Sequence, residues 1–143
     1  RHFSARLKST MVRELDQMVR NLETQREQVL DARSPGRFKG TEPEPRVGLR
    51  GGHIPGSLNL PFTRLFGEFG MMLPPEELKS VFENAGLDLK KPVVTSCGSG
   101  VTASVLALGL ELVGHRDVAV FDGSWTEWAS HEDLPAETAQ EKA

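Results

Sequence analysis

The chain has little cysteine and no long apolar run. Its single cysteine, Cys97, cannot form an internal disulfide and cannot build a thiolate zinc site alone. A reducing compartment is therefore the natural setting. The longest apolar run, VTASVLALGL (101–110), covers 10 residues, whereas a membrane-spanning helix needs about 20. The sequence also contains no secretory signal, and we expect no membrane partner.

No excess of either charge is present. The 17 basic and 20 acidic residues give a formal net charge of −3, which argues against general binding to nucleic acids and leaves room for a local basic pocket. A chain of 143 residues fits one domain, and we find no internal repeat or low-complexity segment. The first residue is Arg1, not Met, so we expect a fragment of a longer protein.

Strand and helix patterns alternate along the chain. Strands are expected within 28–33, 56–61, 91–96 and 117–123, and helices within 11–22, 34–38, 73–87, 101–114 and 124–128. A long loop with two prolines and four glycines spans 40–52. This alternation predicts an α/β domain with a largely parallel sheet and helices on both faces. We expect a linker or arm at 1–9, the domain at 10–130 and a flexible tail at 131–143.

Cys97 lies where a predicted buried strand meets a predicted helix, in VVTSCGSGVTASV (93–105). Ligands of open α/β sheets bind at the carboxyl ends of the strands. Gly98 and Gly100 allow the backbone to curl, so that amide groups turn inward at the start of the helix. Such a ring of amides favours an anion at its centre, and a thiolate at Cys97 would be stabilised there.

The residues alone leave several interpretations of this cysteine. A lone cysteine is often an inert, buried hydrophobic residue. A cysteine phosphatase needs a longer loop closed by an arginine, but Ser96 precedes Cys97 and no arginine follows before Arg116. Sulfur transfer needs only a thiolate and a pocket for the resulting persulfide, which neutral amides can provide. The position of Cys97 favours a reactive thiol, and the absence of a loop arginine disfavours a phosphatase.

Several motifs resemble those of mercaptopyruvate sulfurtransferases, members of the rhodanese superfamily. CGSGVT (97–102) matches their active-site loop and GRFKGTEPEPR (36–46) matches a segment upstream of it. Further matches are DAR (31–33), GHIPGSLNLPF (52–62) and DGSWTEW (122–128). The resemblance implies a rhodanese-like fold over 10–130. Thiosulfate-preferring rhodaneses typically carry basic residues in this loop, so the uncharged loop here favours an organic thiol donor.

The resemblance also implies a reaction. Cys97 would attack the sulfur of 3-mercaptopyruvate, form a persulfide and release pyruvate, and a thiol such as reduced thioredoxin, or cyanide in an assay, would accept the sulfur. Arg37 and Arg46 match the family's substrate-binding arginines, and a guanidinium suits the oxygens of a 2-oxo carboxylate. Ser99 and Thr102 match loop hydroxyls that hydrogen-bond the sulfur or the leaving enolate. The amides expected to hold the persulfide belong to Gly98, Ser99, Gly100 and Val101. No metal or cofactor is implied, and the compartment expected is mitochondrial or cytoplasmic.

Ordinary roles are open to each of these residues. Arg37 would otherwise be a surface charge on a short helix, and Arg46 a solvated residue in a proline-rich loop. Ser99 is also a turn former, and Thr102 a helix-start residue.

Other polar and aromatic residues are interpreted as structural. We expect His53 to hydrogen-bond within its loop and Asp31 to cap neighbouring amides at a strand end. Two tryptophans are expected to pack as lid or core and two glutamates to be solvated, namely Trp125 and Trp128, and Glu42 and Glu44.

The chain is shorter than the family leads one to expect. Its members usually have two rhodanese domains, of which the second holds the cysteine, and this chain corresponds to the second. An Asp and a His proposed to form a relay with the loop serine come from the first domain, so no residue here is assigned to them. An upstream rhodanese-like domain is thus an expected partner. The alternatives to a mercaptopyruvate enzyme are a single-domain persulfide carrier that relays sulfur without useful turnover, and a thiosulfate-using rhodanese.

Overall fold

The protein is built around a sheet of five parallel strands. This computed structural model describes residues 12–98 and 101–138. The strands are β1 (Val12–Arg13), β2 (Gln28–Asp31), β3 (Leu58–Asn59), β4 (Val93–Ser96) and β5 (Val118–Phe121). The α-helices are α2 (Leu15–Thr24), α3 (Pro35–Lys39), α4 (Pro75–Asn84), α5 (Val101–Leu112) and α6 (Ser124–Ser130), and two 3-10 helices are η1 (Phe62–Leu65) and η2 (Glu68–Gly70). Each predicted strand and helix is present. The four predicted strands and helices α4 and α5 have bounds within the predicted ranges, whereas α2, α3 and α6 extend one or two residues beyond them.

The strand order is β1-β5-β4-β2-β3, which puts β4 at the centre. All four residues of β4 are buried, as expected for a parallel strand covered on both faces. β2 pairs with β4 in a register that joins Val29 to Val94 and Asp31 to Ser96. The predicted α/β fold with a parallel sheet is confirmed.

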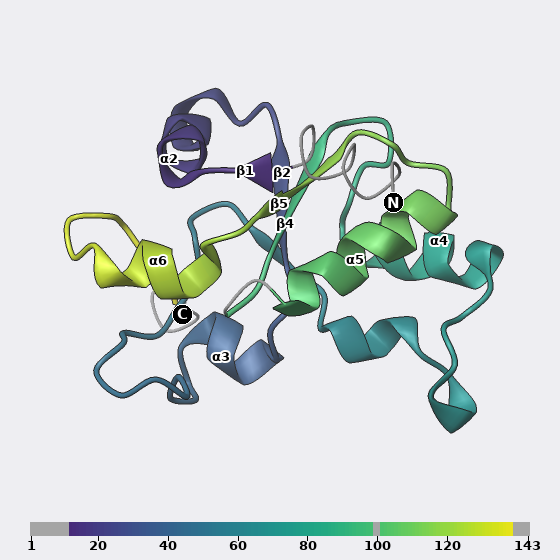
Figure 1. The fold of residues 1–143 in the computed structure, drawn as a ribbon, viewed down its shortest axis with the longest axis horizontal. Coiled ribbons are helices and arrows are strands. Elements are labelled where there is room, and N and C mark those ends of the chain that lie inside the picture. Colours follow the sequence, from purple (N-terminus) through teal and green to yellow (C-terminus); the bar gives the residue numbers. More distant parts are fainter. Residues whose placement is uncertain (1–11, 99–100, 139–143) are drawn as a thin grey trace.

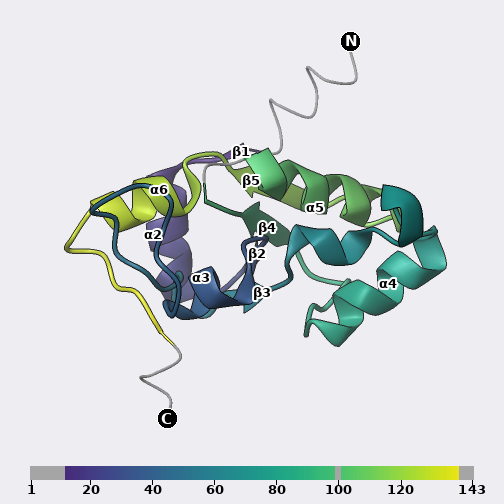
Figure 2. The same ribbon diagram turned by 90° about the horizontal axis from the view of Figure 1, so that it is seen from below.

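Helices cover both faces of the sheet, and each face has its own apolar core. Figure 1 shows α2 and α6 on one side of the strands and α4 and α5 on the other, and Figure 2 shows the same two layers from below. On the α4/α5 side, Phe82, Leu78 and Leu106 are fully buried. On the α2/α6 side, Trp125 and Trp128 fill the core. The packing role expected for both tryptophans is confirmed.

The edge strand β1 was not expected from the sequence. It has only two residues, too few for a period-two pattern, and Val12 pairs with Val120 of β5. Arg13 forms a salt bridge with Glu27 at 2.6 Å, and hydrogen bonds from its guanidinium to that carboxylate raise the pKa of Arg13. The edge strand is therefore tied by its side chain to the chain that leads into β2.

Residues 131–138 of the expected tail lie against the domain. The guanidinium of Arg50 donates to the carbonyl oxygens of His131 (2.9 Å) and Leu134 (2.6 Å). His53 and Glu137 exchange two backbone hydrogen bonds of 2.9 Å, and the indole of Trp128 donates to the carbonyl of Pro135. These contacts hold residues 131–138 against Arg50 of the long loop, His53 after it and Trp128 of α6.

No helix in the described part of the chain is both long and apolar enough to cross a membrane.

Removing a large side chain from the α4/α5 core gives a direct test of this packing. Phe82 is 0% exposed, and we expect Phe82→Ala to lower the free energy of unfolding by about 3–5 kcal/mol, because it removes apolar contact and leaves a cavity. Phe69 is 94% exposed, so Phe69→Ala serves as the matched control, with an expected change within about 0.5 kcal/mol. Urea unfolding measures both changes, provided that the slope of the free energy of unfolding against urea concentration is the same in each variant as in the parent. Equal losses in the two variants would contradict the assigned core.

Candidate active site

Cys97 is the first residue after the central strand β4. Because Asp31 pairs with Ser96 and the amide of Ala32 donates to the carbonyl of Ser96 at 2.8 Å, the loop that follows β2 runs beside the cysteine. Further along the chain, α5 begins at Val101. The cysteine thus occupies the carboxyl edge of the sheet, where the sequence predicted it.

The start of α6 holds the backbone around the cysteine from the neighbouring strand end. The amide of Cys97 donates to the hydroxyl of Ser124 at 3.1 Å, and the amide of Trp125 donates to the carbonyl of Cys97 at 2.8 Å. The carbonyl of Gly98 accepts both the amide (3.0 Å) and the hydroxyl (2.6 Å) of Thr126. The start of α6 therefore positions the amide and the carbonyl of Cys97 and the carbonyl of Gly98.

Ser124 has an unusual conformation for a residue with a side chain. Its φ of 53° lies in the left-handed region, which costs energy outside glycine and persists where the surroundings impose it. Its hydroxyl accepts from the amide of Cys97 and donates to the carbonyl of Phe121 at 2.9 Å. A hydroxyl has one hydrogen to donate. While the Ser124 hydroxyl donates to the carbonyl of Phe121, its oxygen therefore only contacts the sulfur of Cys97, at 3.8 Å, and does not donate to it.

The thiol itself is almost covered. Cys97 is 1% exposed and belongs to the α4/α5 core together with Ala32, Ala103 and Leu106. Burial alone matches the interpretation as a small hydrophobic residue. The polar groups next to it favour a reactive thiol instead, because an inert thiol needs neither nearby arginines nor a loop held by hydrogen bonds.

Beside the cysteine loop lies a cavity of about 220 Å³. Arg37 and Arg46, expected to bind substrate, both line it, together with Gly98, Val101 and Thr102 of the loop. Its remaining lining residues are Glu44, Pro45, Leu49 and Thr126. The structure therefore brings five of the eight predicted site residues to this cavity. A sixth, Cys97, directly precedes Gly98 in the chain but is buried and is not among the lining residues. Ser99 and Gly100 lie outside the described residues.

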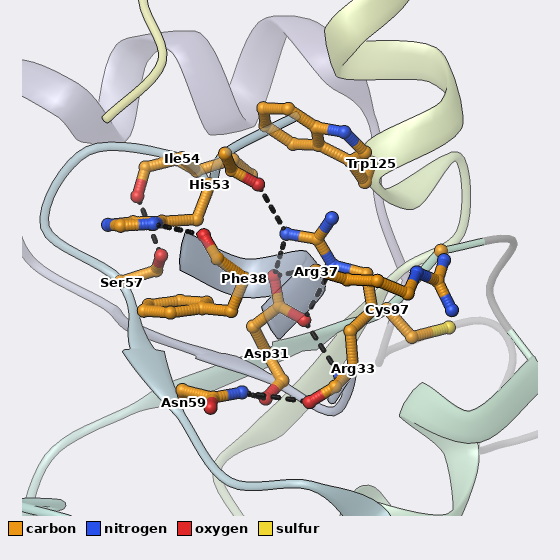
Figure 3. Close-up of polar contacts among 12 residues, drawn as sticks. Asp31, Arg33, Arg37, Phe38, His53, Ile54, Ser57, Asn59, Cys97 and Trp125 are labelled. Carbon is orange, nitrogen blue, oxygen red and sulfur yellow. Dashed lines mark hydrogen bonds and ion pairs between the residues drawn. The ribbon is translucent and has the colours of Figure 1, made fainter. Parts of the chain in front are cut away.

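Arg37 reaches the loop because α3 is short and firmly capped. The amide of Arg37 donates to the hydroxyl of Ser34, and Pro35 begins the helix, as the sequence predicted. Gly40 ends it in the left-handed region with a φ of 83°. A Cβ added at Gly98 would collide with the guanidinium of Arg37, so a side chain here would push this arginine out of its present position. In Figure 3 that guanidinium points in the direction of the Cys97 side chain.

A second arginine, Arg33, lies behind the first and is buried. Its guanidinium donates to both carboxylate oxygens of Asp31 at 2.8 to 3.2 Å and to the carbonyl of Gly52 at 2.7 Å. Its carbon Cζ lies 4.8 Å from the centroid of the Trp125 ring, a cation–π geometry seen in Figure 3. The expectation that Asp31 caps a neighbouring amide is confirmed, since it accepts from the amide of Arg33.

Glu44 joins the two arginines, and here the sequence-based interpretation is wrong. We expected Glu44 to be solvated, but its side chain is 1% exposed and forms salt bridges to Arg33 at 3.0 Å and Arg37 at 2.9 Å. Glu42, two residues before it, is exposed as expected. The physical reason for the difference is that the buried guanidinium of Arg33 needs a second carboxylate, and Glu44 meets it.

Sequence reasoning also missed Arg33, Ser124 and Thr126 as parts of the site. All three occur in motifs that carry the family resemblance, DAR and DGSWTEW, but their contacts are made across strands that are distant in sequence. By contrast, the structural role of His53 is confirmed, although its partner lies in α3 and not in its own loop: its Nδ1 lies 2.7 Å from the carbonyl of Phe38, and its ring stacks on that of Phe38.

Within residues 12–98 and 101–138, no group of three or more His, Cys, Asp or Glu side chains is placed to hold a metal ion.

The sequence over residues 13–131 matches the family model described as the rhodanese-like domain. The chain belongs to this family. It is 49% identical over 138 residues to "Thiosulfate/3-mercaptopyruvate sulfurtransferase 1, mitochondrial" of Arabidopsis thaliana, covering 96% of this chain and 36% of the relative. It is 50% identical over 126 residues to "3-mercaptopyruvate sulfurtransferase" of Mus musculus, covering 88% and 42%.

A solved structure agrees with these relatives. The Tum1 protein from Saccharomyces cerevisiae superimposes with a TM-score of 0.81 at 35% identity, over 91% of this chain and 47% of that chain. The chain therefore spans less than half the length of each of these proteins. The family membership that the motifs predicted is confirmed.

Ser124 provides a test of the clamp on the cysteine loop. Ser124→Ala leaves the buried amide of Cys97 without its acceptor, so we expect a loss of about 1–3 kcal/mol in the free energy of unfolding and faster hydrogen exchange at that amide. The hydroxyl of Ser130, in the same helix, donates to the carbonyl of Glu127, and Ser130 is exposed. Ser130→Ala is therefore the control, expected within about 0.5 kcal/mol of the parent. Exchange at the Cys97 amide that is as slow in Ser124→Ala as in the parent would refute the clamp.

Proposed function

We propose that this chain is a sulfurtransferase that takes sulfur from 3-mercaptopyruvate and carries it as a persulfide on Cys97. The observation that carries this proposal is the cavity beside the cysteine loop, which is lined by Arg37 and Arg46 and by Gly98 and Thr102 of the loop. Two guanidinium groups supply planar, paired donors for a carboxylate and an adjacent ketone oxygen. The sulfurtransferase names of its relatives support the reaction class.

The proposed reaction is a single displacement at sulfur. The thiolate of Cys97 attacks the sulfur of 3-mercaptopyruvate, an S–S bond forms, and the C–S bond of the donor breaks. The electron pair of that bond leaves with the enolate of pyruvate, which takes up a proton to give pyruvate. The guanidinium groups of the two arginines stabilise the charge on the carboxylate and on the developing enolate oxygen. Thr102 lines the same cavity.

The second half of the reaction needs a thiol. We propose reduced thioredoxin or a small thiol as the acceptor, with an upstream rhodanese-like domain as a further partner, because the matched relatives are more than twice as long as the chain. The name of the Arabidopsis relative includes "mitochondrial", which supports a mitochondrial setting, with the cytoplasm as the other reducing compartment proposed.

Thiosulfate is the second candidate donor, and the double name of the Arabidopsis relative favours considering it. The described part of the cysteine loop, Gly98, Val101 and Thr102, has no charged side chain. A dianion such as thiosulfate would therefore rely on Arg37 and Arg46 alone. This difference favours mercaptopyruvate as the better donor.

Replacing the cysteine tests the proposal at its centre. We expect the chain with 3-mercaptopyruvate to form pyruvate and to gain the mass of one sulfur atom on Cys97, with continued turnover when a thiol acceptor is supplied. Cys97→Ser should abolish both, because the hydroxyl does not form a persulfide. Mass spectrometry and pyruvate release measure the two events. Full turnover by Cys97→Ser would disprove the mechanism, while a single burst of pyruvate without turnover would identify a sulfur carrier instead.

The arginines test the choice of donor. Arg37→Lys and Arg46→Lys keep the positive charge and lose the paired geometry, so we expect kcat/KM for mercaptopyruvate to fall by about 10- to 100-fold, the effect of a lost hydrogen bond to a charged group. The loss with thiosulfate should be smaller. Arg116→Lys, at an exposed position outside the cavity, is the control and should leave both rates unchanged. Equal losses for the two donors would exclude a carboxylate-specific role.

A further inference from the structure

The carboxylate of Glu44 is divided between two arginines that differ in exposure. Its Oε2 accepts from Nη1 of Arg33 at 3.0 Å and from Nε of Arg37 at 3.3 Å, and its Oε1 accepts from Nη2 of Arg37 at 2.9 Å. The side chain of Arg33 is 1% exposed, whereas that of Arg37 is 26% exposed. Glu44 therefore connects a guanidinium that solvent hardly reaches with one that borders the cavity.

Arg33 gives this connection a rigid base. Its guanidinium is engaged by the carboxylate of Asp31, the carbonyl of Gly52 and the face of Trp125 as well as by Glu44. No rotation of its side chain keeps all four contacts. The contact with Arg33 consequently holds the carboxylate of Glu44 in one orientation, in which both of its oxygens accept hydrogen bonds from Arg37.

We propose that Glu44 is a positioning residue for donor recognition, which acts through Arg37 and makes the site selective for a planar 2-oxo carboxylate; this inference rests on the proposed function. A guanidinium has five N–H donors, and Glu44 accepts from Nε and from one hydrogen of Nη2. The Nη1 group and the second Nη2 hydrogen remain for the ligand. Their direction is set by Glu44, because Arg37 on a five-residue helix is otherwise partly exposed.

The same contacts indicate different roles for the two arginines that line the cavity, Arg37 and Arg46. Asp31 and Glu44 together offset the charges of Arg33 and Arg37. Arg46 is exposed and has no ion pair with any residue in the described part of the chain. Arg37 thus acts chiefly as an oriented donor, and Arg46 supplies the net positive charge. A planar carboxylate gains more from oriented donors than tetrahedral thiosulfate does, since thiosulfate accepts hydrogen bonds from many directions.

Glu44→Gln tests this role with little change in shape. The amide still accepts from one arginine but leaves Arg37 less firmly held and no longer neutralised. We expect kcat/KM for mercaptopyruvate to fall about tenfold or more, while KM for thiosulfate stays the same or falls. The ratio of the two kcat/KM values then shifts toward thiosulfate, which a general loss of folded protein would not produce. Glu42→Gln, in the same loop but exposed, is the matched control and should leave the ratio unchanged.

A double-mutant cycle shows whether Glu44 acts through Arg37. In an Arg37→Gln background, Glu44→Gln should change the donor ratio by less than about twofold, because residues that act on one interaction are not additive. An additive effect would overturn the proposal. Glu44→Asp keeps the charge next to buried Arg33 and shortens the reach to Arg37, so it gives the same donor shift in a folded chain if Glu44→Gln does not fold.

A binding measurement keeps this inference separate from the proposed function. In NMR spectra of the arginine Nε–H groups, Arg37 should give a slowly exchanging signal that Glu44→Gln loses, while the signal of Arg33 persists through Asp31. Titration with pyruvate should shift the Arg37 signal. Glu44→Gln should lower the affinity for pyruvate at least fivefold, because an oriented hydrogen bond to a charged group is lost. If the parent chain gains no sulfur from mercaptopyruvate, the proposed function fails, yet these signals still decide the role of Glu44. Unchanged Arg37 exchange and pyruvate affinity in Glu44→Gln would refute it.

Discussion

Parallel pairing of β2 with β4 determines which parts of the chain can meet at the cysteine. The register joins Asp31 to Ser96, so the segments that leave the two strands start from adjacent points on one edge of the sheet. One segment carries Arg33 and then α3, and the other carries Cys97. A shift of this register by one residue would turn every side chain of β2 to the opposite face, and the arginines would no longer meet the cysteine loop.

The charged groups behind the cavity are costly to bury, and their arrangement shows how that cost is offset. The side chains of Asp31, Arg33 and Glu44 are between 1% and 4% exposed. Buried ions are tolerated when they are paired and their remaining hydrogen-bonding groups are satisfied, and removing one partner typically costs about 3–5 kcal/mol. Here each guanidinium hydrogen bond reported for Arg33 ends on a carboxylate or a carbonyl. The network is therefore both a source of rigidity and a point of vulnerability.

The sequence predicted the fold well because its signals are local. Helix-capping residues, apolar periodicity and glycine or proline boundaries lie within a few positions of the elements they define, as Ser34 and Pro35 do for α3. The two-residue strand β1 has no such signal, since its pairing with β5 joins residues more than a hundred positions apart. The contacts of Leu134 with Arg50 and of Glu137 with His53 each join residues 84 positions apart, and they too have no local signal.

The same distinction explains which parts of the site were predicted. Cys97, Arg37 and Arg46 were found because the cysteine loop and the motif GRFKGTEPEPR mark them directly. Glu44 lies in that motif too, but its neighbours Pro43 and Pro45 suggest an exposed loop, and its surroundings in sequence give no hint of a buried guanidinium. The partner that buries it, Arg33, is 11 positions away. A carboxylate between two prolines is thus hard to classify until the arginine behind it is seen.

Trp125 couples the two halves of the site. Its backbone amide donates to the carbonyl of Cys97, and its ring covers the guanidinium of Arg33. Its indole nitrogen donates to the carbonyl of Arg50 at 2.9 Å, in the loop that carries Arg46. Because the ring is 1% exposed and packed on every side, it has little freedom to move. Trp125 therefore links the backbone at Cys97 to the buried arginine Arg33 and to the loop that carries Arg46.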